Sequence, residues 1–175
     1  MRKVVVCLLA VLVCSWAVAN AGQVAKGDKE LAFSFSYVDF SFDDGGGDLK
    51  DMSLAARFGY LLTDTHEVGG VFSYLKHEET GSPDEDGTGF GAFYNYNFKA
   101  GTNMNPYLEA HYQVIGGDAG DVVDSQYGLA VGIKMYPWDN GGFRFGVSWD
   151  QLTGADSNPD GDGIVAFAGI QLKWN

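Results

Sequence analysis

The most constraining feature of this sequence is a series of eight segments in which every second residue is apolar or aromatic. A period of two residues indicates a β-strand with two unlike faces. Most segments are ten or eleven residues long, which exceeds the usual strand of about 5–6 residues in soluble proteins. That length matches the roughly 9–11 tilted residues that a strand needs to cross a bilayer. The expected strands are Leu31–Phe42, Met52–Leu62, Glu67–Lys76, Gly89–Phe98, Tyr107–Ile115, Tyr127–Tyr136, Phe143–Leu152 and Ile164–Trp174.

The two faces of these strands differ in size and polarity. One face carries large aromatic and aliphatic residues, and the other carries mostly Gly, Ala, Ser, Asn and Gln with scattered charges. In FGAFYNYNF, Phe90 and Tyr94 belong to the large face, and Phe93 is the one large ring expected on the small face. A soluble lipocalin-like barrel would bury the large face, but an eight-stranded interior is too narrow for so many rings. The pattern therefore favours a barrel with its aromatic face in lipid.

The phase of three segments stays open at this stage. The alternation slips near Val38-Asp39, which predicts a β-bulge there and a place for Asp39 in the lumen. Gly69-Gly70 blurs the pattern in the third segment, and the fifth, 107–115, is compatible with either phase.

Acidic residues are concentrated in every second connection. The first, third, fifth and seventh connections hold 15 of the 23 Asp and Glu residues, whereas the three compact turns between them hold only Asp64 and Asp139. A soluble sandwich has no evident reason to place its acids at one end. Short turns at one end and longer, polar connections at the other are typical of an outer-membrane barrel.

The first 21 residues differ in composition from the rest. Arg2 and Lys3 precede an apolar run, and Ala19-Asn20-Ala21 is a small-residue cleavage pattern. We interpret residues 1–21 as a secretory signal peptide and residues 22–175 as one barrel domain. Both cysteines lie in the first segment, so the exported chain would have no disulfide and no thiolate metal site. The net charge of −12 argues against nucleic acid as a partner.

Together the leader, the eight segments and the C-terminal stretch GIVAFAGIQLKWN resemble the small eight-stranded outer-membrane barrels of the OmpA/OmpX type. The resemblance covers nearly the whole chain after the leader and rests on pattern more than on invariant residues. It implies an all-β fold, an eight-stranded antiparallel up-and-down transmembrane β-barrel in the outer membrane, reached by signal-peptide-directed export. It also implies contact with the lipid bilayer and lipopolysaccharide, help from the outer-membrane assembly machinery, and a monomeric state. In the family the last strand ends on an aromatic residue, whereas here Asn175 follows Trp174.

The small face predicts a polar network in the barrel interior. Charges inside a narrow barrel persist only when they are paired or hydrated. We therefore expect a plugged, hydrogen-bonded lumen without an open channel. The residues predicted to form this network are Arg57, Glu67, Glu109, His111, Lys134, Arg144, Asp150 and Lys173.

The last acidic connection suggests a weak cation site. Asp156, Asn158, Asp160 and Asp162 place oxygen ligands at every second position, as at the start of a calcium-binding loop. The twelfth position would be Phe167 instead of Glu. We favour a solvated, turn-forming loop, and keep weak Ca²⁺ binding, shared with Asp84 and Asp86, as a hypothesis. No other cofactor is expected.

No catalytic residue emerges from the sequence. Nucleophilic catalysis needs a nucleophile and a base in contact, and His111-Tyr112-Gln113 has Gln where a lipid-A deacylase-like barrel would have Ser. We expect a protein that is not an enzyme, with a structural or surface-interaction role and acidic extracellular loops. The alternative is a narrow transport path for small apolar solutes through the barrel wall.

Overall fold

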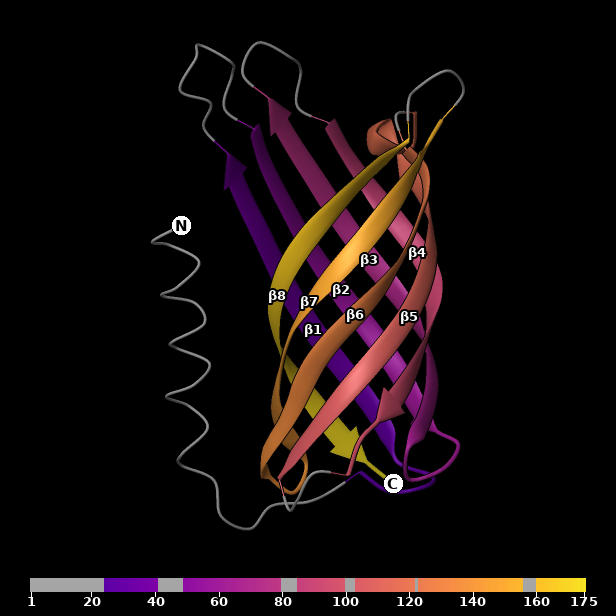
Figure 1. Ribbon diagram of the computed structural model, residues 1–175, viewed down its shortest axis with the longest axis vertical. Helices are drawn as coiled ribbons and strands as arrows, with labels where there is room; N and C mark the ends of the chain where they lie inside the picture. The colour runs from indigo at the N-terminus through magenta and orange to yellow at the C-terminus, as the bar shows by residue number, and fades with distance from the viewer. Residues whose placement is uncertain (1–23, 41–48, 80–84, 100–102, 122, 156–159) are drawn as a thin grey trace.

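The protein is a closed barrel of eight antiparallel strands joined in chain order (Figure 1). The computed structural model describes residues 24–40, 49–79, 85–99, 103–121, 123–155 and 160–175, so the expected leader, 1–21, lies outside the described residues. Within the described part, no helix has the length and apolar character needed to cross a membrane. The strands are β1 Lys29–Phe40, β2 Leu49–Leu61, β3 His66–Glu79, β4 Glu85–Asn97, β5 Met104–Gly117, β6 Val123–Trp138, β7 Gly141–Gly154 and β8 Gly161–Trp174, with a short 3-10 helix η1 at Asp118–Asp121.

The predicted fold class is confirmed, but the strands are longer than predicted. They contain 12 to 16 residues each, and the additional residues come mainly from the expected acidic connections. Glu85, Asp86 and Asp124, for example, lie on β4 and β6. In an antiparallel hairpin every second opposed residue pair exchanges two backbone hydrogen bonds, in water as well as in lipid, so pairing continues after the apolar alternation ends. We call the end at which β1–β2, β3–β4, β5–β6 and β7–β8 connect the acidic end, and the opposite end the turn end.

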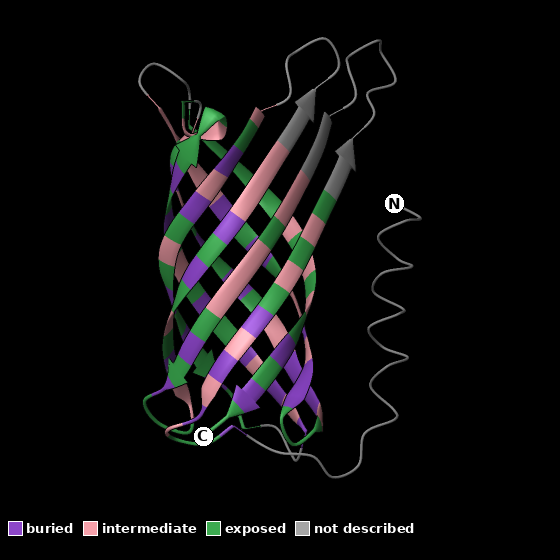
Figure 2. Ribbon diagram, turned by 180° about the vertical axis from the view of Figure 1, so that it is seen from behind, coloured by how far each residue is buried: buried purple, intermediate pink, exposed green. Residues whose placement is uncertain are grey.

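Exposed and buried residues alternate along the strands (Figure 2). On β4 Phe90 is 65% exposed, whereas Phe93 is 5% exposed and lies inside the barrel. The prediction for Phe93 is therefore confirmed, and the outer surface carries the aromatic band. The phases of β3 and β5 are also clear, because Val71 and Tyr107 are buried while Phe72 and Leu108 are exposed.

Phe93 fits inside because a glycine lies opposite its ring. Gly69 on β3 pairs with Phe93, and a Cβ atom added at Gly69 would lie 2.4 Å from the Phe93 Cζ. The same arrangement recurs at the other large inward rings that have a paired residue, so ring and glycine together fill the interior. The further pairs are Tyr107 with Gly132 and Phe167 with Gly146.

The bulge predicted at Val38-Asp39 is wrong. The pairing of β1 with β2 runs from Lys29 to Phe40 without a register shift. The register shifts occur in β6 instead, between Val123 and Ser125 and between Met135 and Trp138, at the two ends of its pairing with β7. Alternation in the sequence slips for reasons of composition as well as of backbone geometry, so the slip alone did not locate a bulge. The side chain of Asp39 lies outside the described residues.

The seam between the first and last strands is paired over only part of its length. β1 pairs with β8 from Lys29↔Trp174 to Phe35↔Ala168. Beyond this point the described residues 36–40 pair only with β2, and 161–167 pair only with β7. Figure 1 shows the two strands diverging toward the acidic end. Backbone hydrogen bonds thus join β1 and β8 near the turn end of this seam, whereas the described residues of the two strands are not paired with each other near the acidic end.

Candidate functional site in the barrel lumen

A buried ammonium group organises the interior near the turn end. Lys134 on β6 is fully buried, and its Nζ donates hydrogen bonds of 2.5 Å to Glu30 Oε2 and Glu67 Oε2. Glu67 also accepts hydrogen bonds from the Nδ2 atoms of Asn95 and Asn97, at 3.0 and 3.3 Å. Tyr136 donates its hydroxyl proton to Glu30 Oε1. One cation therefore holds two buried carboxylates, and neutral donors add further hydrogen bonds to both of them.

A second ionic cluster lies around Glu109 on β5. Arg57 on β2 pairs with Glu109 Oε1, and Arg144 on β7 donates from Nη2 to Glu109 Oε2 at 3.1 Å. Arg144 also donates to the Tyr107 hydroxyl at 3.0 Å and lies 5.2 Å from the centre of that ring. The Arg57 guanidinium lies 5.5 Å from the centre of the Phe93 ring. The inward rings therefore stack against the cations as well as filling space.

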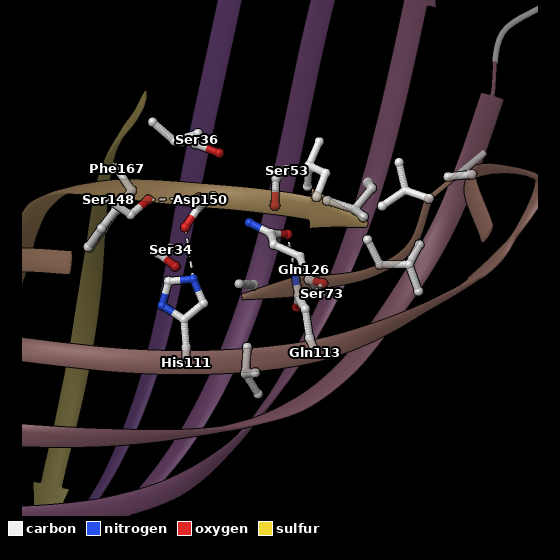
Figure 3. Close-up of a pocket in the computed structure, with 18 of the residues that line it drawn as sticks. Ser34, Ser36, Ser53, Ser73, His111, Gln113, Gln126, Ser148, Asp150 and Phe167 are labelled. Atoms are coloured by element: carbon white, nitrogen blue, oxygen red, sulfur yellow. Dashed lines mark hydrogen bonds and ion pairs between the residues drawn. The ribbon is translucent and has the colours of Figure 1, made fainter. Parts of the chain in front are cut away.

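His111 is held between two carboxylates. Its Nε2 lies 2.9 Å from Asp150 Oδ1 and its Nδ1 lies 3.3 Å from Glu109 Oε1. Ser148 donates its hydroxyl proton to Asp150 Oδ2 at 2.9 Å, as Figure 3 shows. A serine nucleophile must instead contact the histidine that activates it. In this arrangement the two carboxylates position the imidazole, and the Ser148 hydroxyl is hydrogen-bonded to Asp150 instead of to His111.

The structure places all eight residues of the predicted lumen network inside the barrel. Seven of them form the two ionic clusters, and Lys173 lies nearer the turn end, 3.9 Å from Asp28 and above the Tyr136 ring. Sequence reasoning missed Glu30, because the predicted first strand began at Leu31. Moving that boundary by one residue would have placed Glu30 on the same face as Ala32 and Ser34, which is the signal that could have found it.

The half of the lumen nearer the acidic end contains a cavity of about 390 Å³. Its walls come from all eight strands and from η1, and the Arg57, Glu109, His111 and Asp150 side chains line it on the side of the second cluster. The remaining lining combines hydroxyl and amide groups with apolar side chains and with the charged Lys76 and Glu85, and Figure 3 labels several of the polar residues. The lumen is therefore divided into a densely hydrogen-bonded part and a hollow part.

The residues of the predicted cation site are only partly described. Asp84, Asp156 and Asn158 lie outside the described residues. Asp160 Oδ1 accepts a hydrogen bond from the Gly154 backbone N–H at 3.0 Å, and Asp162 Oδ2 accepts one from the Trp149 indole at 3.2 Å. Among the described residues no group of three or more His, Cys, Asp or Glu side chains is arranged to hold a metal ion.

An exposed ion pair between Lys99 and Asp64 lies at the turn end. Lys99 Nζ donates to Asp64 Oδ2 at 2.8 Å, and the Lys26 backbone N–H donates to Asp64 Oδ1 at 3.0 Å. These hydrogen bonds hold the pKa of the Asp64 carboxyl below its usual value. They connect the segment before β1 with the β2–β3 and β4–β5 turns.

Comparison with known proteins identifies the fold. No family model matches the chain, and no curated protein matches it in sequence. Among solved structures, Neisserial surface protein A is similar with a TM-score of 0.60 and 19% identity over 86% of this chain and 99% of that one. The outer membrane protein OprG of Pseudomonas aeruginosa is similar with a TM-score of 0.55 and 16% identity, covering 89% and 100%. The N-terminal barrel of OprF from the same organism gives 0.52 and 19%, covering 86% and 99%. The chain thus has the transmembrane fold of the small eight-stranded outer-membrane barrels.

Proposed function

We propose that this protein is an integral barrel of the outer membrane with a structural or surface-interaction role, a plugged polar lumen and an acidic end that faces the cell exterior. The observation that carries the proposal is the buried cluster of Lys134 with Glu30 and Glu67, whose members come from β1, β3 and β6. A side-chain cluster that bridges strands across an eight-stranded barrel occupies the narrow section through which ions would pass. The aromatic outer band supports the membrane location.

Conductance across a planar bilayer tests the plugged lumen. Purified, refolded protein is added to the bilayer, and insertion is verified separately by protease protection in vesicles. The expected result is inserted protein without steady current. A steady, charge-selective current from inserted barrels would overturn the proposal.

The acidic end suggests that its partners are cations and, through bridging cations, the phosphates of lipopolysaccharide. Asp86, Asp118 and Asp124 are exposed at this end. Binding to lipopolysaccharide-containing vesicles should require Ca²⁺ or Mg²⁺ and weaken when Asp118→Asn is combined with Asp124→Asn. Asp139→Asn, at the exposed β6–β7 turn, is the control and should leave binding unchanged. Binding that persists in a chelator would contradict this role.

The last acidic connection is the place where a weak Ca²⁺ site is proposed. If Asp160 and Asp162 join Asp156 and Asn158 as ligands, Ca²⁺ should raise the thermal midpoint of unfolding, because a ligand that binds only the folded state stabilises it. Asp160→Ala should abolish that increase. Equal thermal midpoints of unfolding in Ca²⁺ and in chelator would contradict the site.

The partly paired seam favours a second candidate, a transport path for small apolar solutes through the barrel wall. Ser34 and Ser36 on β1 and Val165 and Phe167 on β8 line the cavity beside this seam. The test measures uptake of a small aromatic solute into vesicles with a lipopolysaccharide outer leaflet, using Ser36→Cys combined with Phe167→Cys. Oxidation, once a gel shift has verified the cross-link, should slow uptake if the path is used. Equal rates in the oxidised and reduced protein would contradict it.

A further inference from the structure

The cavity in the acidic half of the lumen has the size of a ligand site. Its volume of about 390 Å³ falls in the range of roughly 300–1,000 Å³ of small-molecule pockets. At about 30 Å³ for each water molecule, it would hold on the order of a dozen waters. The Arg57, Glu109, His111 and Asp150 side chains line it toward the turn end, and apolar side chains such as Ile115 and Leu152 line it toward the acidic end.

Several polar groups in the cavity wall have no hydrogen-bond partner among the residues that the structure describes. On β1 and β2 the hydroxyls of Ser34, Ser36 and Ser53 line the cavity, and within the described part of the chain none of them has a side-chain hydrogen bond. On β5 and β6 a short amide relay lines it, in which Gln113 Nε2 donates to Gln126 Oε1 at 2.5 Å. The Gln126 amide NH₂ group is left without a partner among the described residues.

A further hydrogen bond positions the relay. Ser73 on β3 donates to Gln113 Oε1 at 3.0 Å, and both side chains are more than nine-tenths buried. Figure 3 shows Ser73, Gln113 and Gln126 meeting across the cavity from Ser34 and His111. Hydrogen-bonded amides opposite serine hydroxyls provide donors and acceptors at two walls of one space, which is the arrangement that orients a ligand in a pocket.

The charged groups of the lining have partners already or balance one another. Arg57 pairs with Glu109, and His111 pairs with Asp150. With Lys76 and Glu85 nearer the acidic end, the lining has three basic and three acidic side chains. A charged ligand would have to displace one of these buried pairs, which is costly. A fully apolar ligand would strip water from the hydroxyl and amide groups and leave them unsatisfied.

We propose that this cavity binds a small uncharged molecule rich in hydroxyl groups, of the size of a monosaccharide or disaccharide. The hydroxyls of this ligand would form hydrogen bonds with Ser34, Ser36, Ser53 and Gln126. The Phe167 ring also lines the cavity and would contact a face of the ligand. This inference goes beyond the proposed function, because a plugged lumen and an acidic surface require no ligand. A barrel that conducts no ions can still fail to bind a sugar, and a barrel that conducts ions can still bind one, so the two tests are independent.

Saturation-transfer NMR on the refolded full chain in nanodiscs tests the inference. The probes are glucose and sucrose, with the charged analogues glucuronate and glucosamine and the apolar solute toluene as comparisons. We expect saturable signals from a neutral sugar and none from the charged analogues. Saturable binding of toluene alone, preference for a charged analogue, or no saturable binding of either sugar would overturn it.

Three variants locate the binding. Ser36→Phe places a ring in the cavity and should abolish binding, whereas Ala166→Phe, on the exposed face of β8, is the matched control and should bind as the parent does. Gln126→Leu removes hydrogen-bonding groups at similar size and should weaken binding about tenfold, the loss expected for one or two hydrogen bonds. Native folding of each variant is checked by its heat-dependent gel mobility. Parent-like binding by folded Gln126→Leu, together with loss in Ala166→Phe, would place binding outside the cavity and refute the proposal.

Discussion

Replacing Lys134 by Met removes the one ammonium that holds two buried carboxylates. The Lys134 side chain is 0% exposed, and those of Glu30 and Glu67 are 4% and 2% exposed. Breaking a buried ion pair by removing one partner costs about 3–5 kcal/mol, since an uncompensated charge remains. Lys134→Met should therefore lower the free energy of unfolding by about 3–5 kcal/mol, which raises the unfolding constant by roughly two to four decades.

The assay is urea unfolding in lipid vesicles, followed by the fluorescence of Trp138, Trp149 and Trp174, whose rings are exposed on the barrel exterior. Lys99→Met is the matched control, because Lys99 pairs with Asp64 but its side chain is 52% exposed. It should have little effect, as exposed pairs contribute little. Adding Glu30→Gln and Glu67→Gln to Lys134→Met should restore most of the loss. A loss below about 1 kcal/mol in Lys134→Met, the level of an exposed pair, would refute the view that this cluster stabilises the barrel.

Three further predictions address packing, orientation and pH. Gly69→Ala should destabilise the barrel by about 1–3 kcal/mol through overpacking, because its Cβ would lie 2.1 Å from a backbone oxygen of β2. Gly70→Ala is the control and should be tolerated, since the atom nearest to its Cβ lies at 3.7 Å. Equal urea midpoints of unfolding for the two variants would contradict this prediction. Phe90→Lys should cost about 2–4 kcal/mol if this face meets the bilayer centre, and an unchanged midpoint in vesicles would contradict that placement. The pKa of the Asp64 carboxyl is lowered from 3.8. The ion pair with Lys99 therefore stabilises the folded protein above that pH, and this stabilisation is lost as the pH falls through the folded-state pKa. Lys99→Met should raise the Asp64 pKa in an NMR titration, and no change would argue against the ion pair.

The sequence predicted the strands and their faces well where side chains have two distinct environments. Phe93 is the clearest case, since an isolated inward ring was read from the phase of its neighbours alone. Its pairing partner, Gly69, only interrupts the alternation of its own strand, because a period of two is a property of one strand alone. The cross-strand register, which the sequence does not contain, places Gly69 opposite Phe93, where its missing side chain leaves room for the ring.

Prediction was weaker where polar residues decide the structure. Strand ends and the β6 bulges depend on backbone pairing beyond the lipid, where apolar alternation no longer applies. Glu30 was missed for this reason, although Lys134 and Glu67 were predicted to face inward. Charged residues on the small face indicate that a network exists, but their partners follow only from the three-dimensional closure of the barrel.

The partly paired β1–β8 seam has a consequence for how this chain folds. All other strand pairs are hairpin neighbours, whereas this one joins the two ends of the barrel. The hydrogen bonds from Lys134 and Tyr136 to Glu30 likewise span 104 and 106 residues of sequence. Contacts of such separation carry the largest loop-closure entropy and form late. The hairpins should thus assemble first with the lumen charges still hydrated, and docking of β1 onto β8 should dehydrate and pair them in the same step.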